Sequence, residues 1–217
     1  MKRLLVILLT ICTIFSFSAC NRDDDTPSPS APAYTTSLPE AEGVTNFVQF
    51  TMNNGATFVV ELYPQLAPIT VANFKTLVSQ KYYDGLTFHR ICKDLIQGGD
   101  IDGDGLSSPN QPYITGEFAS NGCTYNTISH KRGVISMART TNPDSAYSQF
   151  FIMQEDHPSF DGSYAAFGCV VAGIETIDEL TNVEVTTQKY SSEKSKPVTP
   201  PVMTSVYFVN YVPQGSE

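Results

Sequence analysis

The sequence predicts a mainly β fold, a closed antiparallel β-barrel capped by two α-helices. Short apolar runs of strand length recur along the chain, a hairpin signal opens the series, and only two segments have the apolar spacing of helices. Many short strands with two helices indicate a barrel with helical caps. A chain of 217 residues has room for one such domain and accessory segments.

The domain opens with a predicted hairpin and helix. From Asn46 to Leu62 apolar and polar residues alternate on both sides of Asn53-Asn54-Gly55, which supplies turn chemistry. Pro68 then begins a segment whose apolar residues recur at spacings of three and four as far as Val78. This spacing predicts a helix of about three turns.

Further elements follow along the rest of the chain. A second short helix is predicted at about Ile174–Leu180, and two long polar stretches, Asp100–Gly133 and Thr186–Pro201, lie between the apolar runs. The remaining runs of strand length are Thr87–Ile91, Val134–Ala138, Gln149–Met153, Ala166–Val171 and Ser205–Val209. These runs complete the predicted barrel.

Residues 1–19 are expected to be a secretory signal peptide, because Met1–Arg3 is basic and Leu4–Phe17 is apolar. The apolar stretch is shorter than the ~20 residues that a membrane span requires. Ser18-Ala19-Cys20 resembles the lipobox of bacterial lipoproteins, although Phe17 stands where that motif usually has Leu. We therefore expect lipidation of Cys20 and an extracytoplasmic domain anchored to a bacterial membrane, with ordinary secretion as the alternative.

Residues 20–44 are acidic and rich in Pro and Ser, which predicts a flexible tether before the domain at 45–212 and a short tail at 213–217. Removal of residues 1–19 leaves 11 basic residues against 22 acidic ones, a formal charge of −11. This charge argues against nucleic acid as a partner. We expect a monomer.

The sequence has no signature of covalent, nucleotide or zinc chemistry, so no metal or cofactor is expected. Cys92, Cys123 and Cys169 have no metal-ligand spacing and are predicted to be small buried hydrophobic residues. His130 and His157 lie in polar loop sequence and are predicted to be at the surface.

One acidic loop remains ambiguous. Asp100-Ile101-Asp102-Gly103-Asp104-Gly105 resembles the start of a calcium loop, but Gln111 occupies the twelfth position and a strand precedes the loop. An Asp/Gly turn is therefore favoured over a calcium site.

A series of short motifs resembles the motifs of cyclophilins, in the same order. They are Phe88-His89-Arg90-Ile91, Gln97-Gly98-Gly99-Asp100, Ser136-Met137-Ala138-Arg139, Ser148-Gln149-Phe150-Phe151-Ile152, Asp161-Gly162 and Ala166-Phe167-Gly168. The resemblance covers nearly the whole chain after Thr45. It implies a cyclophilin-like barrel and a peptidyl-prolyl cis/trans isomerase that acts, without a cofactor, on proline-containing polypeptides during the folding of extracytoplasmic proteins.

By this resemblance Arg90 matches the family's catalytic arginine. Amide resonance gives X-Pro rotation a barrier of about 18–20 kcal/mol, and a donor aimed at the prolyl nitrogen weakens that resonance. A guanidinium, which is always charged, is suited to this. Strand alternation is expected to place Phe88 on the same face as Arg90, and His89 on the other.

The resemblance also implies a substrate groove. Gln97 and Gln149 would hold the substrate backbone, and Phe151 would form the floor of the proline pocket. The full set of expected substrate-binding residues is Phe88, Leu95, Gln97, Ala138, Gln149, Phe151, Phe160 and Tyr164. Two amides that converge with an arginine and aromatic rings have the composition of a peptide groove.

The chain departs from the family pattern at several groove positions. It has one residue fewer between Arg90 and Gln97, Leu95 stands where a Phe-Met pair is common, and Arg139 replaces an Asn. Ser159 and Tyr164 replace the Trp and His of cyclosporin-sensitive members, so cyclosporin should bind weakly. A second hypothesis is therefore a proline-segment binding module or holdase with little turnover.

Overall fold

The computed structural model describes residues 4–5, 37–107 and 111–212. The predicted signal peptide apart from Leu4 and Leu5, the expected lipidation site Cys20, most of the tether and the tail at 213–217 lie outside the described residues. Within the described part, no helix is long and apolar enough to cross a membrane.

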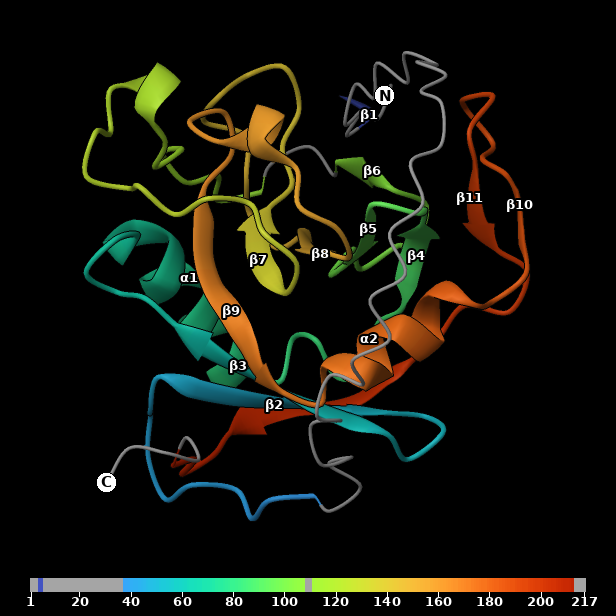
Figure 1. Cartoon of the computed structure of the whole chain (residues 1–217), viewed down its shortest axis with the longest axis horizontal. Helices are drawn as coiled ribbons and strands as arrows, with labels where there is room; N and C mark the ends of the chain where they lie inside the picture. The colour runs from blue at the N-terminus through green and yellow to red at the C-terminus, as the bar shows by residue number, and fades with distance from the viewer. Residues whose placement is uncertain (1–3, 6–36, 108–110, 213–217) are drawn as a thin grey trace, which may run out of the picture.

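One antiparallel sheet dominates the molecule (Figure 1). It has eight strands in the order β12-β2-β3-β9-β7-β8-β5-β4. Their bounds are β2 Phe47–Met52, β3 Thr57–Leu62, β4 Phe88–Ile91, β5 Leu95–Gly98, β7 Val134–Met137, β8 Phe150–Met153, β9 Ala166–Ala172 and β12 Met203–Phe208. The mainly β class predicted from the sequence is confirmed.

The barrel closes where the two end strands meet. Thr87, just before β4, bridges Val202, just before β12, and the Met203 N–H donates to the Leu86 carbonyl at 2.8 Å. The Phe88 N–H donates to the Pro201 carbonyl at 3.0 Å. Closure therefore depends on a short bridge between the segments that precede the two strands, and not on a full ladder.

Two α-helices, α1 (Pro68–Ser79) and α2 (Ile174–Thr181), lie on either side of β9 in the view of Figure 1. Both confirm their predicted positions. The N-terminus of α1 has no local side-chain cap. The buried carboxylate of Glu117 replaces it by accepting the N–H groups of Ile69 at 3.0 Å and Thr70 at 2.7 Å, which would otherwise lack partners.

Apolar side chains form two separate clusters. The main core fills the barrel with aromatic rings, and Phe50 stacks on Phe58 at 4.6 Å between ring centroids. Its fully buried rings are Phe50, Phe58, Phe74, Tyr83, Phe88, Phe150 and Phe167. The smaller groove cluster consists of Leu95, Val134, Ala138, Phe151, Met153, Phe160 and Ala166.

Several short elements lie in segments that the sequence pattern left as loops. Strands β10 (Val185–Thr187) and β11 (Lys194–Pro197) form a hairpin within the polar stretch, and β11 packs beside β4 (Figure 1). Strand β6 (Leu106–Ser107) and the 3₁₀ turns Ala119–Asn121 and Pro158–Phe160 also lie in such segments. Strand β6 pairs with β1 (Leu4–Leu5), which belongs to the apolar stretch of the predicted signal peptide.

The end of the predicted tether contacts the barrel. Glu40 bridges Val209, and the Ala41 N–H donates to the Phe208 carbonyl at 2.8 Å. The N–H of Leu38 donates to the Gln49 side chain at 3.0 Å. Chain packed on the domain therefore begins several residues before Thr45.

Candidate active site

A row of side chains crosses four strands on one face of the sheet. Strand register pairs Arg90 with Gln97, Gln97 with Phe151, and Phe151 with Ser136. Directly opposed residues of antiparallel strands point to the same face. The pairing therefore brings the predicted catalytic residue, one predicted amide and the predicted pocket floor onto one surface.

Phe88 does not belong to this surface. The register of β4 shifts between Phe88, which pairs with Gly98, and Arg90, which pairs with Gln97. This bulge sends the two side chains to opposite faces, since Gly98 and Gln97 are adjacent on β5. Phe88 packs in the main core against Phe150, at 6.0 Å between centroids. The prediction that Phe88 shares the face of Arg90 is wrong.

The polar side chains of the site form a continuous series of hydrogen bonds, in which each side chain donates to the next group. Arg90 Nη1 donates to Gln97 Oε1 at 3.2 Å, and Gln97 Nε2 donates to Gln149 Oε1 at 3.0 Å. Gln149 Nε2 donates in turn to the Leu106 carbonyl at 3.3 Å. All three side chains are buried, so each amide is held in one orientation.

Aromatic rings form a wall of the site beside this series of hydrogen bonds. Phe151 meets Phe160 at 5.8 Å and Tyr164 at 5.6 Å, both edge to face, and Phe160 meets Tyr164 at 5.1 Å. Leu95 and Ala138 belong to the same groove cluster. The structure therefore brings every predicted substrate-binding residue except Phe88 to this region.

His130 supports the floor from behind, which corrects its prediction as a surface residue. It is 1% exposed, and its ring stacks on Phe151 at 6.0 Å between centroids. Its Nδ1 lies 3.0 Å from Asp161 Oδ1 and its Nε2 lies 3.0 Å from Ser136 Oγ. Burial lowers the pKa of His130, although Asp161 opposes this, so the ring is neutral at neutral pH.

The contacts of His130 with Asp161 and Ser136 have the order of a Ser-His-Asp triad. The imidazole also stacks on the Phe151 ring, so these contacts hold the ring that is the predicted floor of the pocket. Only the folded structure reveals this arrangement, because the three residues are separate in the sequence.

A carboxylate that sequence reasoning missed is paired with Arg90. Glu193 accepts from Arg90 Nε at 2.9 Å and from Nη2 at 2.7 Å. Burial disfavours the charged guanidinium, but the hydrogen bond and charge of Glu193 outweigh this and raise the pKa of Arg90. Glu193 lies in the polar stretch Thr186–Pro201, whose composition gives no signal of a site.

Arg139 packs against the same aromatic wall through Tyr164. Its guanidinium lies 5.0 Å from the Phe118 ring centroid and 4.7 Å from that of Tyr164, and its Nη2 donates to the Ser163 carbonyl at 2.8 Å. Stacked arginine and tyrosine stabilise each other through the ring's negative face. The Asn-to-Arg departure therefore stiffens this wall as well as changing its charge.

The acidic loop uses its carboxylates within the chain. Asp100 Oδ2 accepts the N–H groups of Asp104 and Gly105, both at 2.9 Å, and Asp104 Oδ1 accepts the Leu106 N–H at 2.9 Å. These contacts are typical of an Asp/Gly turn. Among the described residues, no three His, Cys, Asp or Glu side chains gather as a metal site.

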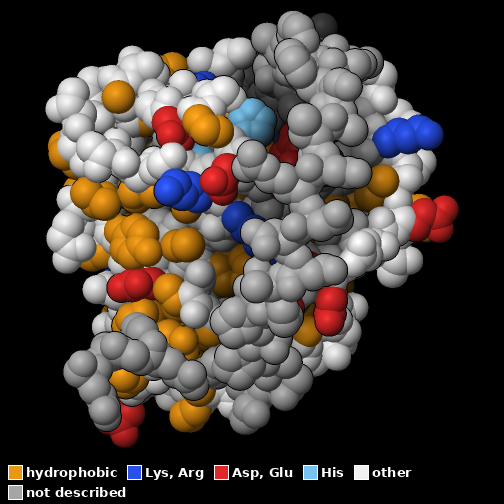
Figure 2. Space-filling model, viewed as in Figure 1, with side chains coloured by type: hydrophobic (Ala, Val, Ile, Leu, Met, Phe, Trp, Pro, Cys, Tyr) orange, Lys and Arg blue, Asp and Glu red, His pale blue; other side chains and the backbone are white. Residues whose placement is uncertain are grey.

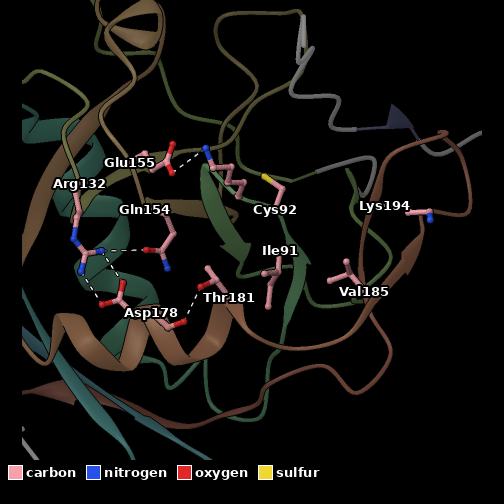
Figure 3. A pocket seen from close by; sticks show the side chains of 10 residues that line it. Ile91, Cys92, Arg132, Gln154, Glu155, Asp178, Thr181, Val185 and Lys194 are labelled. Carbon is pink, nitrogen blue, oxygen red and sulfur yellow. Dashed lines mark hydrogen bonds and ion pairs between the residues drawn. The ribbon is translucent and has the colours of Figure 1, made fainter. Parts of the chain in front are cut away.

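The three cysteines of the described domain are free thiols. Cys123 is buried as predicted, whereas Cys92 and Cys169 are half-buried. Cys92 lines a separate cavity of about 600 Å³, which does not include Arg90. Figure 3 shows Arg132 and Asp178 pointing toward one another in it, and both guanidinium–carboxylate contacts measure 2.8 Å.

The surface charge of the described residues is mixed. Figure 2 shows acidic and basic side chains interspersed on the face that it presents, with apolar side chains between them. The visible part of this face therefore lacks the continuous basic patch that nucleic-acid binding requires.

Comparison with known proteins identifies relatives of this chain. Residues 47–207 match the model of the family described as cyclophilin type peptidyl-prolyl cis-trans isomerase/CLD. A "Peptidyl-prolyl cis-trans isomerase" of Acinetobacter baylyi is 35% identical over 175 residues, which cover 78% of this chain and 89% of the relative. A "Peptidyl-prolyl cis-trans isomerase A" of Dickeya dadantii is 33% identical over 204 residues, covering 91% and 94% of the two chains.

Solved structures share the fold. A crystal structure of a cyclophilin type peptidyl-prolyl cis-trans isomerase from Cryptosporidium parvum, determined in the presence of the dipeptide Ala-Pro, has a TM-score of 0.63 and 28% identity. The match covers 76% of this chain and 99% of the other.

Proposed function

Because this chain belongs to the family of cyclophilin-type peptidyl-prolyl cis-trans isomerases, we propose that Arg90 carries its isomerase activity and that the groove around Phe151 binds the substrate. One observation supports this above all: Arg90, Gln97 and Phe151 lie in a single row of paired residues. The proposed donor and the proposed pocket floor thus belong to strands β4 and β8 of one sheet, with β5 between them, and not to loops.

The reaction needs no bond to break. As an X-Pro bond rotates, its nitrogen loses conjugation with the carbonyl and becomes a better hydrogen-bond acceptor. An Arg90 N–H directed at this nitrogen would stabilise the twisted amide more than the planar one, which is the condition for catalysis. The proline ring would rest on Phe151, with Phe160, Leu95, Ala138 and Tyr164 around it, while Gln97 and Gln149 hold the peptide backbone.

Arg90→Ala tests this assignment. We expect kcat/KM for an Ala-Pro peptide to fall about 10²–10³-fold in a protease-coupled assay, because the variant loses the donor but keeps the apolar groove. Arg90→Lys should not restore full activity, since an ammonium lacks the planar fork. Arg132→Ala is the matched control, because Arg132 is a surface arginine whose partner is Asp178.

The alternative, a proline-segment binding module or holdase, gives a different result. If Arg90→Ala folds normally and isomerises the peptide within a few-fold of the parent, the catalytic assignment fails. A parent protein that binds the peptide without accelerating its isomerisation would support the binding module.

We further propose that the protein acts outside the cytoplasm on a lipid anchor at Cys20, as a monomer that serves unfolded polypeptides containing proline. The basic start, the apolar stretch and Ser18-Ala19-Cys20 support this proposal. Acyl chains supply the membrane affinity that a net charge of −11 cannot.

Cys20→Ser should abolish membrane association. The fraction of protein that sediments with membranes after a salt wash measures this, and Cys92→Ser, which changes a thiol of the folded domain, is the control. A Cys20→Ser protein that still sediments would contradict the lipid anchor.

A further inference from the structure

We propose that Glu193 is a positioning residue for the isomerase reaction, which fixes the guanidinium of Arg90 in its working orientation. The proposal rests on the catalytic role of Arg90 proposed above. Nothing in the sequence motifs points to Glu193, because it lies in the β10–β11 hairpin, about a hundred residues after Arg90.

The contact between the two residues is bidentate. Glu193 Oε2 accepts from Nε at 2.9 Å and Oε1 accepts from Nη2 at 2.7 Å, while Nη1 donates to Gln97 at 3.2 Å. A two-point contact defines the plane of a guanidinium, whereas a single hydrogen bond leaves it free to rotate. Together the contacts with Glu193 and Gln97 fix both the plane and the direction of the Arg90 head group.

The carboxylate is itself held in place. Ser195, whose side chain is completely buried, donates to Glu193 Oε2 at 2.9 Å. Gln188 Nε2 donates to Ser195 Oγ at 3.2 Å and to the His89 carbonyl at 3.3 Å. The hairpin is therefore tied to β4 at the residue next to Arg90, and the network stabilises one position of the carboxylate.

Glu193 approaches Arg90 from a direction in which it can support the guanidinium without blocking the groove. The row of paired residues runs from Phe151 through Gln97 to Arg90, and β4 is the last strand of the sheet. Strand β11 packs against β4, and Figure 1 shows β4 between β5 and β11. Glu193, just before β11, therefore reaches Arg90 from the side away from β5 and β8. The carboxylate thus lies behind Arg90 relative to Phe151, and not in the space between the guanidinium and the pocket floor.

Glu193→Gln is the direct test, because it keeps the size of the side chain but removes the second acceptor and the charge. We expect kcat to fall about tenfold with KM within about twofold of the parent, since orientation of the donor matters in the twisted state and the groove is unchanged. The Nε–H of Arg90, followed by NMR, should exchange with water slowly in the parent and rapidly in the variant. Glu155→Gln is the control, because it removes the same charge from an exposed ion pair with Lys93.

A second variant keeps the test decisive if Glu193→Gln folds poorly. Ser195→Ala leaves the carboxylate but removes its support, and we expect a smaller loss of kcat with the same faster exchange at Arg90 Nε. Parent-level kcat in both variants overturns the proposal. Increased kcat overturns it too, because Glu193 would then be an inhibitory contact, and so does a raised KM with unchanged kcat.

The two proposals fail in different ways. Arg90→Ala with nearly full activity would refute the catalytic assignment itself. A large loss in Arg90→Ala with parent-level activity in Glu193→Gln would refute only the positioning role. The double variant Arg90→Ala/Glu193→Gln should be no slower than Arg90→Ala, because Glu193 acts through Arg90.

Discussion

Phe150 and Phe151 are adjacent in β8 and both are completely buried, yet their surroundings differ in kind. Phe150 meets the rings of Phe50, Phe74, Tyr83 and Phe88 in the main core. Phe151 meets Phe160, Tyr164 and the imidazole of His130. On the face that carries Phe151, buried polar groups lie among the rings, and each of these groups needs a hydrogen-bond partner.

We therefore expect the face of the sheet that carries Phe150 to determine stability, and the face that carries Phe151 to determine activity. Burial of apolar area stabilises the barrel without demanding a particular orientation of dipoles. The groove face instead contains an arginine and two amides, whose burial costs free energy unless each is hydrogen-bonded. Preorganised polar groups of this kind are what electrostatic catalysis requires.

The largest effect should come from exchanging the two phenylalanines for alanine in separate variants. Phe150→Ala should lower the free energy of unfolding by about 3–5 kcal/mol, because it opens a cavity among four rings. Its kcat/KM per folded molecule should stay close to that of the parent. Phe151→Ala should lower kcat/KM strongly, because it removes the proposed pocket floor, and it should cost less stability, because Phe151 packs in the smaller of the two apolar clusters. Urea unfolding and the peptide assay measure the two effects.

Activity should be measured at low temperature, where both variants remain folded, and Phe150→Leu is the milder control for the core side. If Phe150→Ala loses as much activity per folded molecule as Phe151→Ala, the two faces are not separable. If Phe151→Ala is the less active but also the less stable variant, the groove contributes more to folding than this comparison assigns to it.

Regular elements were predictable where local pattern decides the structure. The apolar residues that alternate around Asn53–Gly55, and those at helical spacing after Pro68, pack in the main core. Strands β2 and β3 and helix α1 therefore lie where the periodicity predicts them. The resemblance to cyclophilins supplied Arg90 and the groove, which periodicity alone could not.

The features that the sequence did not predict correctly have a common physical cause. The bulge in β4 reverses the expected face of Phe88, and a one-residue shift of register leaves no mark in composition. His130 is buried by contacts with Asp161 and Ser136, and Glu193 is brought to Arg90 by a hairpin of polar sequence. Each depends on long-range contacts, which a local pattern does not encode.

The smaller effect concerns His89, the residue between Phe88 in the core and Arg90 on the groove face. Its side chain is buried, and both of its ring nitrogens lack a hydrogen-bond partner in the described structure. Burial lowers its pKa from 6.5 to about 4, the charge of Arg90 acts in the same direction, and Asp104 opposes both. The folded protein therefore binds a proton at His89 less readily than the unfolded chain does.

This sign fixes the pH dependence of stability. Well above pH 6.5 His89 is neutral in both states and contributes no pH dependence. As the pH falls through 6.5 toward 4, the unfolded state gains protons that the folded state does not. Lowering the pH from about 7 to about 5 should therefore lower the free energy of unfolding of the parent by about 2 kcal/mol through this residue.

The variant His89→Leu places a side chain without a titratable group at the bulge. This part of the loss should vanish in it, while buried His130 still contributes in the same direction. Urea unfolding of both proteins at the two pH values measures the difference. Equal losses in parent and variant would mean that His89 is protonated as readily in the folded state as in the unfolded chain, and that the side chain at the bulge is solvated and not buried.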